Sequence, residues 1–464
     1  MKFKKIILPL LAFCVLGLSS CSDDDGPSYS DTTLKNTELM TILKSKGYTF
    51  DEQGKLLLDE KAKSTTSLDL SGTKLSDLSG LDIFPNLVEV NLANNDYGPV
   101  FDFSVLPASV TSVDLRDNKI FDFEGLVKNE SEDDEEIKTT ILHPLTKLYL
   151  PATAKYNIED LVPFYTTSTS TNMQMQDASG NLKAYTTLRD IPDEYFRNYL
   201  KGQFPTLFNG DQLDISKKMA LAEQGKNIEM GFMTRPKDYD KIKSIEGVEY
   251  FINNPFYKTF FVGINCPAQC SISYIAPRSN VKALMLYNVD TSDGVDFSQA
   301  TKLASIQFVN NNSLTTLDLS NTLCTNQKIA NFDVLTSNAL ICKHCKNLAE
   351  IKFPNPSEGL ASTLVFGDLP SLKKLDLSFV IGIQTLGLLQ LQNCTITYPK
   401  LKYIVYNGQK LEDLSSGEKV DFAISEDIFN MNQTKTFITT YRKNLSDDYS
   451  SYDDLEGYRW SKYM

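Results

Sequence analysis

The chain has 464 residues, 41% of them apolar, and its formal net charge is −13 at pH 7. This length and apolar content suffice for two or three separate cores, so several modules are expected. An acidic chain repels the phosphates of nucleic acids, and the composition therefore excludes nucleic acid as a partner.

Residues 1–20 have the organisation of a lipoprotein signal peptide. Three lysines precede the apolar run Ile6–Leu18, which is too short to span a bilayer comfortably. The run ends in Leu-Ser-Ser-Cys, which resembles a bacterial lipobox. That resemblance implies cleavage before Cys21 and acylation of Cys21, and several acyl chains would hold the protein on a membrane. A secretory signal with an incidental cysteine is the alternative.

Residues 21–37 read as a flexible acidic tether, rich in serine, aspartate and threonine. The sequence Ser-Asp-Asp-Asp-Gly directly after Cys21 resembles the export signal of surface lipoproteins in one group of Gram-negative anaerobes. The resemblance implies an outer-membrane lipoprotein exposed on the cell surface. The alternative is a solvated tether without a sorting role, which charged runs usually are.

A repeat organises residues 38–165, the predicted first module. Three similar segments begin at Thr65, Leu87 and Val110. Their paired apolar positions are Leu68/Leu70, Val90/Leu92 and Val113/Leu115, with periods of 22 and then 23 residues. This period is typical of leucine-rich repeats. Apolar residues two apart share one face of a strand, and stacked coils bury that face together. The pattern therefore predicts an α/β solenoid, and its alternative is three amphipathic strands of a sandwich.

Two features interrupt or follow these repeats. Asn95 and Asn118 occupy equivalent positions at the strand ends and are predicted to satisfy unpaired backbone groups of the turn.

An insert at 129–136 has six acids in eight residues and is expected to be a solvated loop, since it lacks the ligand spacing of a calcium site. The pattern resumes at Leu148, and the polar stretch 166–185 is the predicted linker to a second module.

Residues 186–424 form the predicted second module. A helical pattern over Ile191–Phe204, which Asp193 can cap, repeats the helical entry of the first module. The segments at 76–81 and 243–248 align without gaps, which indicates two tandem modules of one design. The entry segment with its following repeats resembles bacterial surface leucine-rich repeat proteins, including the internalin-like class. The calcium loop of that class has decayed here, so no calcium is implied.

The strands of the second module are less regular. The candidate pairs are Leu284/Leu286, Ile306/Phe308, Leu317/Leu319, Ile351/Phe353, Leu375/Leu377 and Ile404/Tyr406. One interval, from Ile306 to Leu317, is only 11 residues, too short for a coil, so one of the two lies off the main sheet. Residues 249–280 match no repeat and are expected to be a loop or hairpin. Residues 425–464 are predicted to be a C-terminal cap and tail.

The predicted function is binding of a protein partner through the concave strand face. Recognition residues should stand at the outward strand positions. In the first module these are Ser67, Asp69, Glu89, Asn91, Ser112, Asp114, Arg116, Lys147 and Tyr149, and in the second Gln307, Asp318, Lys352, Lys373, Asp376, Lys402 and Val405. A surface glycan-binding or carbohydrate-processing accessory protein is the alternative, for which Tyr149, Tyr406 or Trp460 would stack on sugar rings. A ligand-free scaffold is a third.

No nucleophile motif, phosphate loop or histidine metal pair is present, so neither an enzyme nor a cofactor is predicted. Six cysteines remain after Cys14 and Cys21 are set aside. Cys266/Cys270 and Cys342/Cys345 are close enough in sequence for disulfides or a zinc site. Cysteines that directly precede repeat strands instead favour packing as small buried side chains.

Overall fold

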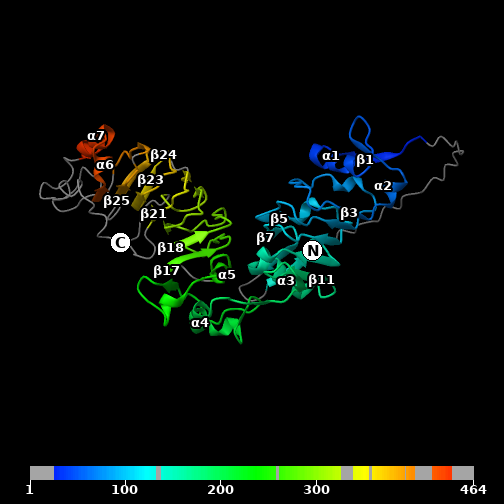
Figure 1. Ribbon diagram of the computed structural model, residues 1–464, viewed down its shortest axis with the longest axis horizontal. Coiled ribbons are helices and arrows are strands. Elements are labelled where there is room, and N and C mark those ends of the chain that lie inside the picture. Colours follow the sequence, from blue (N-terminus) through cyan, green and yellow to red (C-terminus); the bar gives the residue numbers. More distant parts are fainter. Residues whose placement is uncertain are drawn as a thin grey trace, which may run out of the picture.

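In a computed structural model the chain forms two modules, which lie beside one another (Figure 1). The structure describes residues 26–131, 137–257, 261–325, 338–354, 358–391, 393–402 and 421–441. The predicted signal peptide, Cys21, Ile404, Val405, Tyr406 and Trp460 lie outside these residues. Each module has its own apolar core. The boundary between the cores falls between Tyr185, which belongs to the first core, and Ile191, which belongs to the second, although Tyr156 and Ile158 also pack with the second core.

The first module begins with a small cap at the outer end of its stack (Figure 1). The cap consists of β1 (Tyr29–Thr33), α1 (Thr37–Ser45), β2 (Lys55–Leu57) and α2 (Glu60–Ser64). The prediction of a flexible tether over 21–37 is wrong for its second half, because β1 pairs with β2 and Leu34 is buried in the module core. Asn36 caps α1, since its Oδ1 accepts a hydrogen bond from the Leu39 amide at 3.0 Å. Leu39 and Leu43 are fully buried and four residues apart, so one face of α1 packs on the module core.

Short parallel strands, one per turn of the chain, form a six-stranded sheet with the order β12-β11-β10-β6-β4-β3. Its strands are β3 (Ser67–Asp69), β4 (Glu89–Asn91), β6 (Ser112–Asp114), β10 (Lys147–Leu150), β11 (Asn172–Gln176) and the antiparallel edge strand β12 (Leu182–Ala184). The residues in register are Leu68, Val90, Val113, Leu148 and Met173. All five are buried, so the predicted strand positions share one apolar strip.

Asn95 and Asn118 satisfy backbone groups of their turns, as predicted, and they also link neighbouring turns of the chain. The Asn118 amide donates to the carbonyls of Leu92 at 3.0 Å and Leu115 at 2.9 Å, and its Oδ1 accepts from the Tyr97 amide at 3.2 Å. Asn95 likewise donates to the carbonyl of the preceding turn, that of Leu70, at 3.0 Å. Each side chain thus satisfies buried backbone groups of two successive turns.

The chain between these strands returns through short elements. They are η1 (Leu81–Ile83), β5 (Val100–Asp102), η2 (Phe103–Val105), β7 (Asp122–Glu124), η3 (Ala152–Tyr156) and α3 (Leu161–Thr167). The acidic insert differs from the predicted loop, because residues on its two sides pair as an antiparallel hairpin of β8 (Val127–Ser131) and β9 (Ile137–Ile141). Residues 132–136 of the insert lie outside the described part of the chain.

The prediction of a linker at 166–185 is wrong. β11 pairs in parallel with β10 over four residues, and β12 adds to β11 in antiparallel orientation. The linker was predicted from the polar run Thr166–Thr171. In the structure this run forms only the end of α3 and the following turn. The segment Asn172–Gln176 alternates polar and apolar residues, which is the signature of a half-buried strand. These residues complete the first module.

The second module also starts with a cap. It comprises β13 (Leu188–Arg189), α4 (Glu194–Gln203), η4 (Pro205–Leu207), β14 (Phe208–Asn209) and β15 (Gln212–Asp214). The predicted helix over 191–204 is α4, and Asp193 caps it by accepting from the amides of Tyr195 and Phe196, each at 3.0 Å. η5 (Tyr239–Lys241) and α5 (Val248–Ile252) follow.

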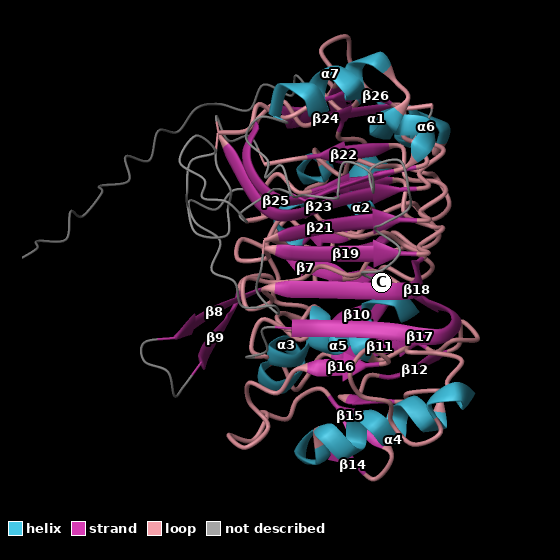
Figure 2. Cartoon of the chain, turned by 90° about the vertical axis from the view of Figure 1, so that its left-hand side faces the viewer, coloured by secondary structure: helices cyan, strands magenta, loops and turns pink. Residues whose placement is uncertain are grey.

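An eight-stranded parallel sheet builds the second module, and Figure 2 shows its strands stacked one above another. The strands are β16 (Ile228–Met230), β17 (Phe261–Ile272), β18 (Ala283–Thr291), β19 (Ser305–Val309), β21 (Ala339–Lys343), β23 (Gly359–Gly367), β25 (Val380–Leu389) and β27 (Asp421–Ile424). Residues 249–280, expected to be a loop or hairpin, instead supply α5 and the long strand β17.

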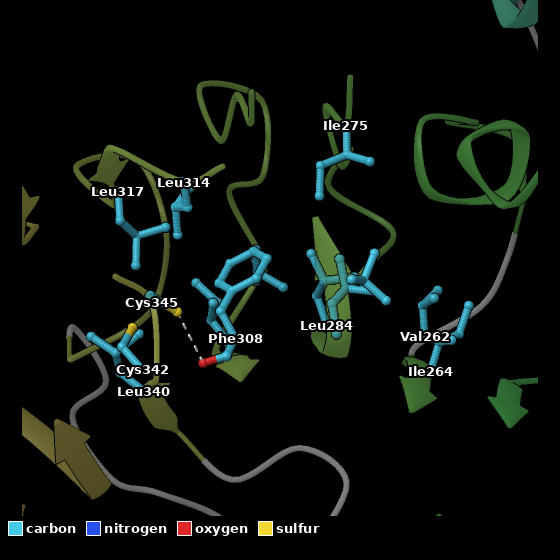
Figure 3. Packing of buried hydrophobic residues seen from close by; sticks show 14 of the residues in the cluster. Val262, Ile264, Ile275, Leu284, Phe308, Leu314, Leu317, Leu340, Cys342 and Cys345 are labelled. Atoms are coloured by element: carbon cyan, nitrogen blue, oxygen red, sulfur yellow. Dashed lines mark hydrogen bonds between the residues drawn. The ribbon is translucent and has the colours of Figure 1, made fainter. Parts of the chain in front are cut away.

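The 11-residue interval is explained by a second set of short strands on the other side of several turns. β20 (Thr316–Asp318) pairs with β22 (Glu350–Lys352), and β24 (Lys374–Asp376) pairs with β26 (Thr395–Thr397). Ile306 therefore lies on the large sheet and Leu317 lies opposite it. Figure 3 shows Leu314 and Leu317 entering the same core as Phe308 and Leu340. The strand pairs predicted from the sequence therefore included some strands of the large sheet and some of the small opposite strands.

Two short helices end the described part of the second module. α6 (Glu426–Phe429) and α7 (Asn432–Tyr441) lie at the far end of the stack (Figure 1). Phe437 is buried and its ring stacks on that of Tyr398, with centroids 4.7 Å apart. The helices cover apolar surface of the last turns. Residues from 425 onward were predicted to form such a cap.

The modules also contact each other directly. The Arg278 Nη2 atom of the second module lies 2.5 Å from both Asp122 Oδ2 and Glu159 Oε2 of the first. Beside this cluster the ring of Phe121 stacks on that of Tyr274, with centroids 4.8 Å apart. A charge network and an aromatic contact thus join the two cores.

Candidate functional site

The strand register of the first sheet aligns the predicted recognition residues in two polar rows. The first row is Ser67, Glu89, Ser112, Lys147 and Asn172, and the second is Asp69, Asn91, Asp114, Tyr149 and Gln174. The apolar strip around Val113 lies between the rows and faces the core, because side chains alternate along a strand. All first-module candidates other than Arg116, which follows β6, are therefore members of these rows.

Charged and aromatic side chains meet at the centre of the polar rows. The Lys147 ammonium pairs with the Glu89 carboxylate across β6 and lies 5.1 Å from the centroid of the Tyr149 ring. The Arg116 guanidinium lies 5.8 Å from the same centroid, so two cations approach one aromatic ring. The sheet therefore offers a cationic and aromatic centre, while Glu89 and Asp114 supply the negative charge beside it.

Asp114 holds Arg116 in place. Arg116 Nε donates to Asp114 Oδ1 at 2.9 Å and Nη2 donates to Oδ2 at 2.6 Å, a two-point contact with a carboxylate whose residue is only 7% exposed. This hydrogen bond raises the pKa of the Arg116 guanidinium. At the end of the row, hydrogen bonds from the Ser71 hydroxyl and amide lower the pKa of Asp69. Asp69 and Arg116 are therefore charged at neutral pH, and the guanidinium has a fixed orientation.

Sequence reasoning missed Asn172 and Gln174, which extend the two rows onto β11. Gln174 Nε2 donates to Asn172 Oδ1 at 3.0 Å, and Asn172 Nδ2 lies 3.5 Å from the Tyr149 hydroxyl. The available signal was the alternation in Asn172–Gln176, together with a spacing of 25 residues between Leu148 and Met173. Assignment of this segment to a linker hid both residues.

The candidates of the second module do not form one surface. Gln307 stands on β19 of the large sheet, whereas Asp318, Lys352 and Asp376 stand on the opposite small strands. Lys352 Nζ lies 3.5 Å from Asp318 Oδ2, so these two share a pair on β20 and β22. Two candidates remain within the described chain. The exposed Lys373 donates a hydrogen bond from its ammonium to the Pro370 carbonyl, and Lys402 forms an ion pair with Glu358. The prediction of a common face here is wrong, because it combined strands from two sheets.

The outward face of the large sheet is mostly apolar along its middle row. Its middle row contains Met285, Gln307, Ile341, Val365, Gly387 and Ala423 in register. Val365 and Ala423 are buried and pack with Ile341 and Leu389, separately from the main core. A polar face with mixed charge, as the sequence predicts, is therefore found on the first module and not on this sheet.

The six cysteines are buried free thiols in the described chain. The Cys345 thiol points at the Phe308 carbonyl, at 3.6 Å, inside the second core (Figure 3). Burial raises the pKa of the Cys324 thiol to about 12 and that of Cys345 to about 11. Within the described residues, no group of three or more His, Cys, Asp or Glu side chains is arranged to hold a metal ion.

Comparison with models of known protein families finds no match, and no curated protein matches the sequence. Among the described helices, none combines the length and apolar character needed to cross a bilayer.

Proposed function

We propose that this chain is a leucine-rich repeat protein of two tandem modules that binds a protein partner through the polar rows of the first sheet. In this proposal a lipid on Cys21 anchors the protein at the outer membrane, exposed on the cell surface. The observation that carries the binding role is the alignment of Glu89 with Lys147 in one row and of Asp114 with Tyr149 in the other, on the face opposite the buried strip.

The repeat class is supported by the way successive turns share their hydrogen bonds. Strands with periods of 22 and 23 residues pair in parallel, and Asn95 and Asn118 join neighbouring turns. A stack of this kind places one short strand per turn on a continuous face, so its surface residues are spaced by the strand separation of about 4.8 Å. Such a face suits an extended partner.

A protein partner fits the polar rows better than a glycan. Sugar rings stack on open aromatic faces, but the Tyr149 ring is approached by both Lys147 and Arg116. Interfaces between proteins favour tyrosine and arginine at their centres, with charges that pair across the contact. The centre of the rows has this composition.

The test is retention of a partner on immobilised residues 22–464, using surface proteins extracted from the bacterium that produces the chain. We expect the double variant Arg116→Glu/Lys147→Glu to retain at least about tenfold less partner than the unsubstituted chain, since reversed charges oppose the same surface. The matched control is Lys63→Glu, which changes an exposed lysine on α2, outside the rows. Equal retention by the double variant and the control would contradict the proposal.

The anchor has a separate test. Cells producing the Cys21→Ser variant should release the protein from the membrane fraction, because the acylated sulfur is lost. Protease added to intact cells should degrade the unsubstituted protein if the anchor lies on the outer surface. Protection from protease would place it on the inner side and remove surface exposure from the proposal.

A further inference from the structure

A cavity of about 620 Å³ lies where the two modules meet. The first module supplies Asn129 of the β8–β9 hairpin, with Val162 and Pro163 of α3. The second supplies Met219, together with Tyr250 of α5 and residues 254–257, which follow α5. Figure 1 shows α3 and α5 on the two sides of this junction. Neither module forms the cavity alone, and clefts of this size between domains are common sites for small ligands.

The walls of the cavity are held by hydrogen bonds on both sides. Asn129 Nδ2 donates to the Glu159 carbonyl at 2.6 Å, and the Thr139 hydroxyl donates to Asn129 Oδ1 at 2.9 Å, which ties the hairpin to the body of the first module. On the other side, the Phe256 amide donates to Asn254 Oδ1 at 2.8 Å. A cavity with fixed walls loses little conformational entropy when a ligand enters.

The surface of the cavity is mostly apolar and includes one exposed ring. Phe256 has 51% of its surface exposed, although it sits beside Pro255 and the buried Tyr250. Large apolar side chains left in contact with water inside a concave site indicate a ligand or partner surface. The body of the occupant should therefore be apolar.

The charge of the cavity is opposite to that of the molecule. The chain carries a net charge of −13, yet the residues around the cavity include Lys217 and Lys218 and no aspartate or glutamate. Lys217 donates to the Phe208 carbonyl at 2.8 Å, and Lys218 is exposed at the rim. A ligand with one negative group would pair with Lys218 while its apolar part remains inside.

We propose that this junction cavity binds an amphipathic organic anion, of the class of medium-chain carboxylates. The alkyl part contacts Phe256, Val162 and Met219, and the carboxylate pairs with the Lys218 ammonium. This site is separate from the polar rows of the first sheet, and it stands whether or not those rows bind a protein.

The experiment measures binding of decanoate to residues 22–464 by isothermal titration calorimetry, with decanol as the neutral analogue. We expect saturable decanoate binding with a dissociation constant below about 1 mM. Decanol should bind at least about tenfold more weakly, since it lacks the charge that pairs with Lys218. Absence of saturable decanoate binding, or equal binding of decanol, would overturn the proposal.

Two variants locate the site. Phe256→Ala and Lys218→Glu should each weaken decanoate binding by about tenfold, through loss of apolar contact and reversal of charge respectively. The matched controls are Met233→Ala and Lys243→Glu, which change exposed residues that do not border the cavity. All four sites are exposed, so the fold should persist, and circular dichroism checks this. Controls that weaken binding as much as the cavity variants would overturn the placement.

Discussion

At the scale of single residues, two glycines occupy corresponding positions in the two modules. Gly80 precedes η1 with φ of 98°, and Gly247 precedes α5 with φ of 107°. A Cβ added to Gly80 would lie 2.4 Å from Leu34, and one added to Gly247 would lie 2.9 Å from Ile191. Both positions need a left-handed backbone and space for a neighbouring apolar side chain. The ungapped alignment of 76–81 with 243–248 correctly paired these two glycines.

The first prediction concerns Gly247. Gly247→Ala should lower the free energy of unfolding by about 1–3 kcal/mol, because alanine is strained at this φ and its methyl group meets Ile191. Urea unfolding followed by circular dichroism measures the change. Gly202→Ala is the matched control, since this helical glycine has open space around the added Cβ. The control should be neutral or stabilising by up to about 1 kcal/mol. A stable Gly247→Ala variant would remove the argument for strain.

The second prediction concerns the cysteines. Iodoacetamide at pH 8 should alkylate native Cys324 roughly a thousandfold more slowly than an unfolded thiol, because burial raises its pKa to about 12 and blocks access. Mass spectrometry of residues 22–464 gives the number of labels. In urea without reductant, all six thiols should react. Labelling of four or fewer under those conditions would restore the disulfide alternative for Cys266/Cys270 or Cys342/Cys345.

At the scale of elements, the repeats explain what could be read from sequence and what could not. The strands around Leu68, Val90 and Val113 were predictable, since a single apolar pair per turn recurs at an almost constant period. Several turns carry a second strand segment, as β5 and β7 do in the first module and as Leu317 follows Ile306 in the second, and both segments of a turn bury apolar residues in one core. Period alone cannot say which side of a turn a strand occupies. Pairing partners decide this, and they become visible only in three dimensions.

The candidate site was predictable for the same reason and to the same extent. Glu89 shares a row with Lys147, and Asp114 shares one with Tyr149, because the recurring strand pattern fixes their register. Asn172 was missed because its polar surroundings were assigned to a linker, although its strand follows at an ordinary repeat spacing. In the second module, Gln307 and Asp318 fell on different sheets. The contacts of Lys147 and Arg116 with the Tyr149 ring depend on side-chain directions that the sequence does not contain.

The third prediction tests the bond between turns. Asn118→Ala should lower the free energy of unfolding by about 2–4 kcal/mol, because the Leu115 carbonyl and the Tyr97 amide lose their hydrogen bonds to this side chain. The Leu92 carbonyl loses one of its two donors and keeps that from Asn95. The measurement is urea unfolding. Asn86→Ala is the control, since this exposed side chain makes one hydrogen bond, to the Lys63 carbonyl at 2.8 Å. Similar losses in both variants would mean that the turns are not joined through Asn118.

At the scale of the whole molecule, the contact between the modules contains more acid than base. Arg278 pairs with Asp122 and Glu159, while Asp160 lies beside them and is only 9% exposed. The pKa of Asp160 is raised to about 8, first by burial and then by the charge of Asp122. Burial also raises the pKa of Glu159, although Arg278 opposes the shift. One base cannot neutralise three carboxylates, so at neutral pH the cluster is most stable with Asp160 protonated.

This arrangement gives the fourth prediction, a stability that falls with rising pH. The unfolded Asp160 ionises near its ordinary pKa of 3.8, whereas the folded group keeps its proton until about pH 8. Between these values the folded chain binds more protons, so the contribution of Asp160 is full below about pH 4 and is lost by about pH 8. Urea unfolding at pH 5, 6, 7 and 8 measures the slope.

Asp160→Asn isolates the contribution, because an amide of the same shape can still accept the hydrogen bond from Asn157 Nδ2 but cannot ionise. We expect the variant to lose less stability between pH 5 and pH 8 than the unsubstituted chain, and to be the more stable of the two at pH 8. Other titrating groups are common to both proteins and cancel in the difference. Parallel pH profiles would show that Asp160 is ionised in the folded protein, and that Arg278 compensates the cluster more fully than its geometry indicates.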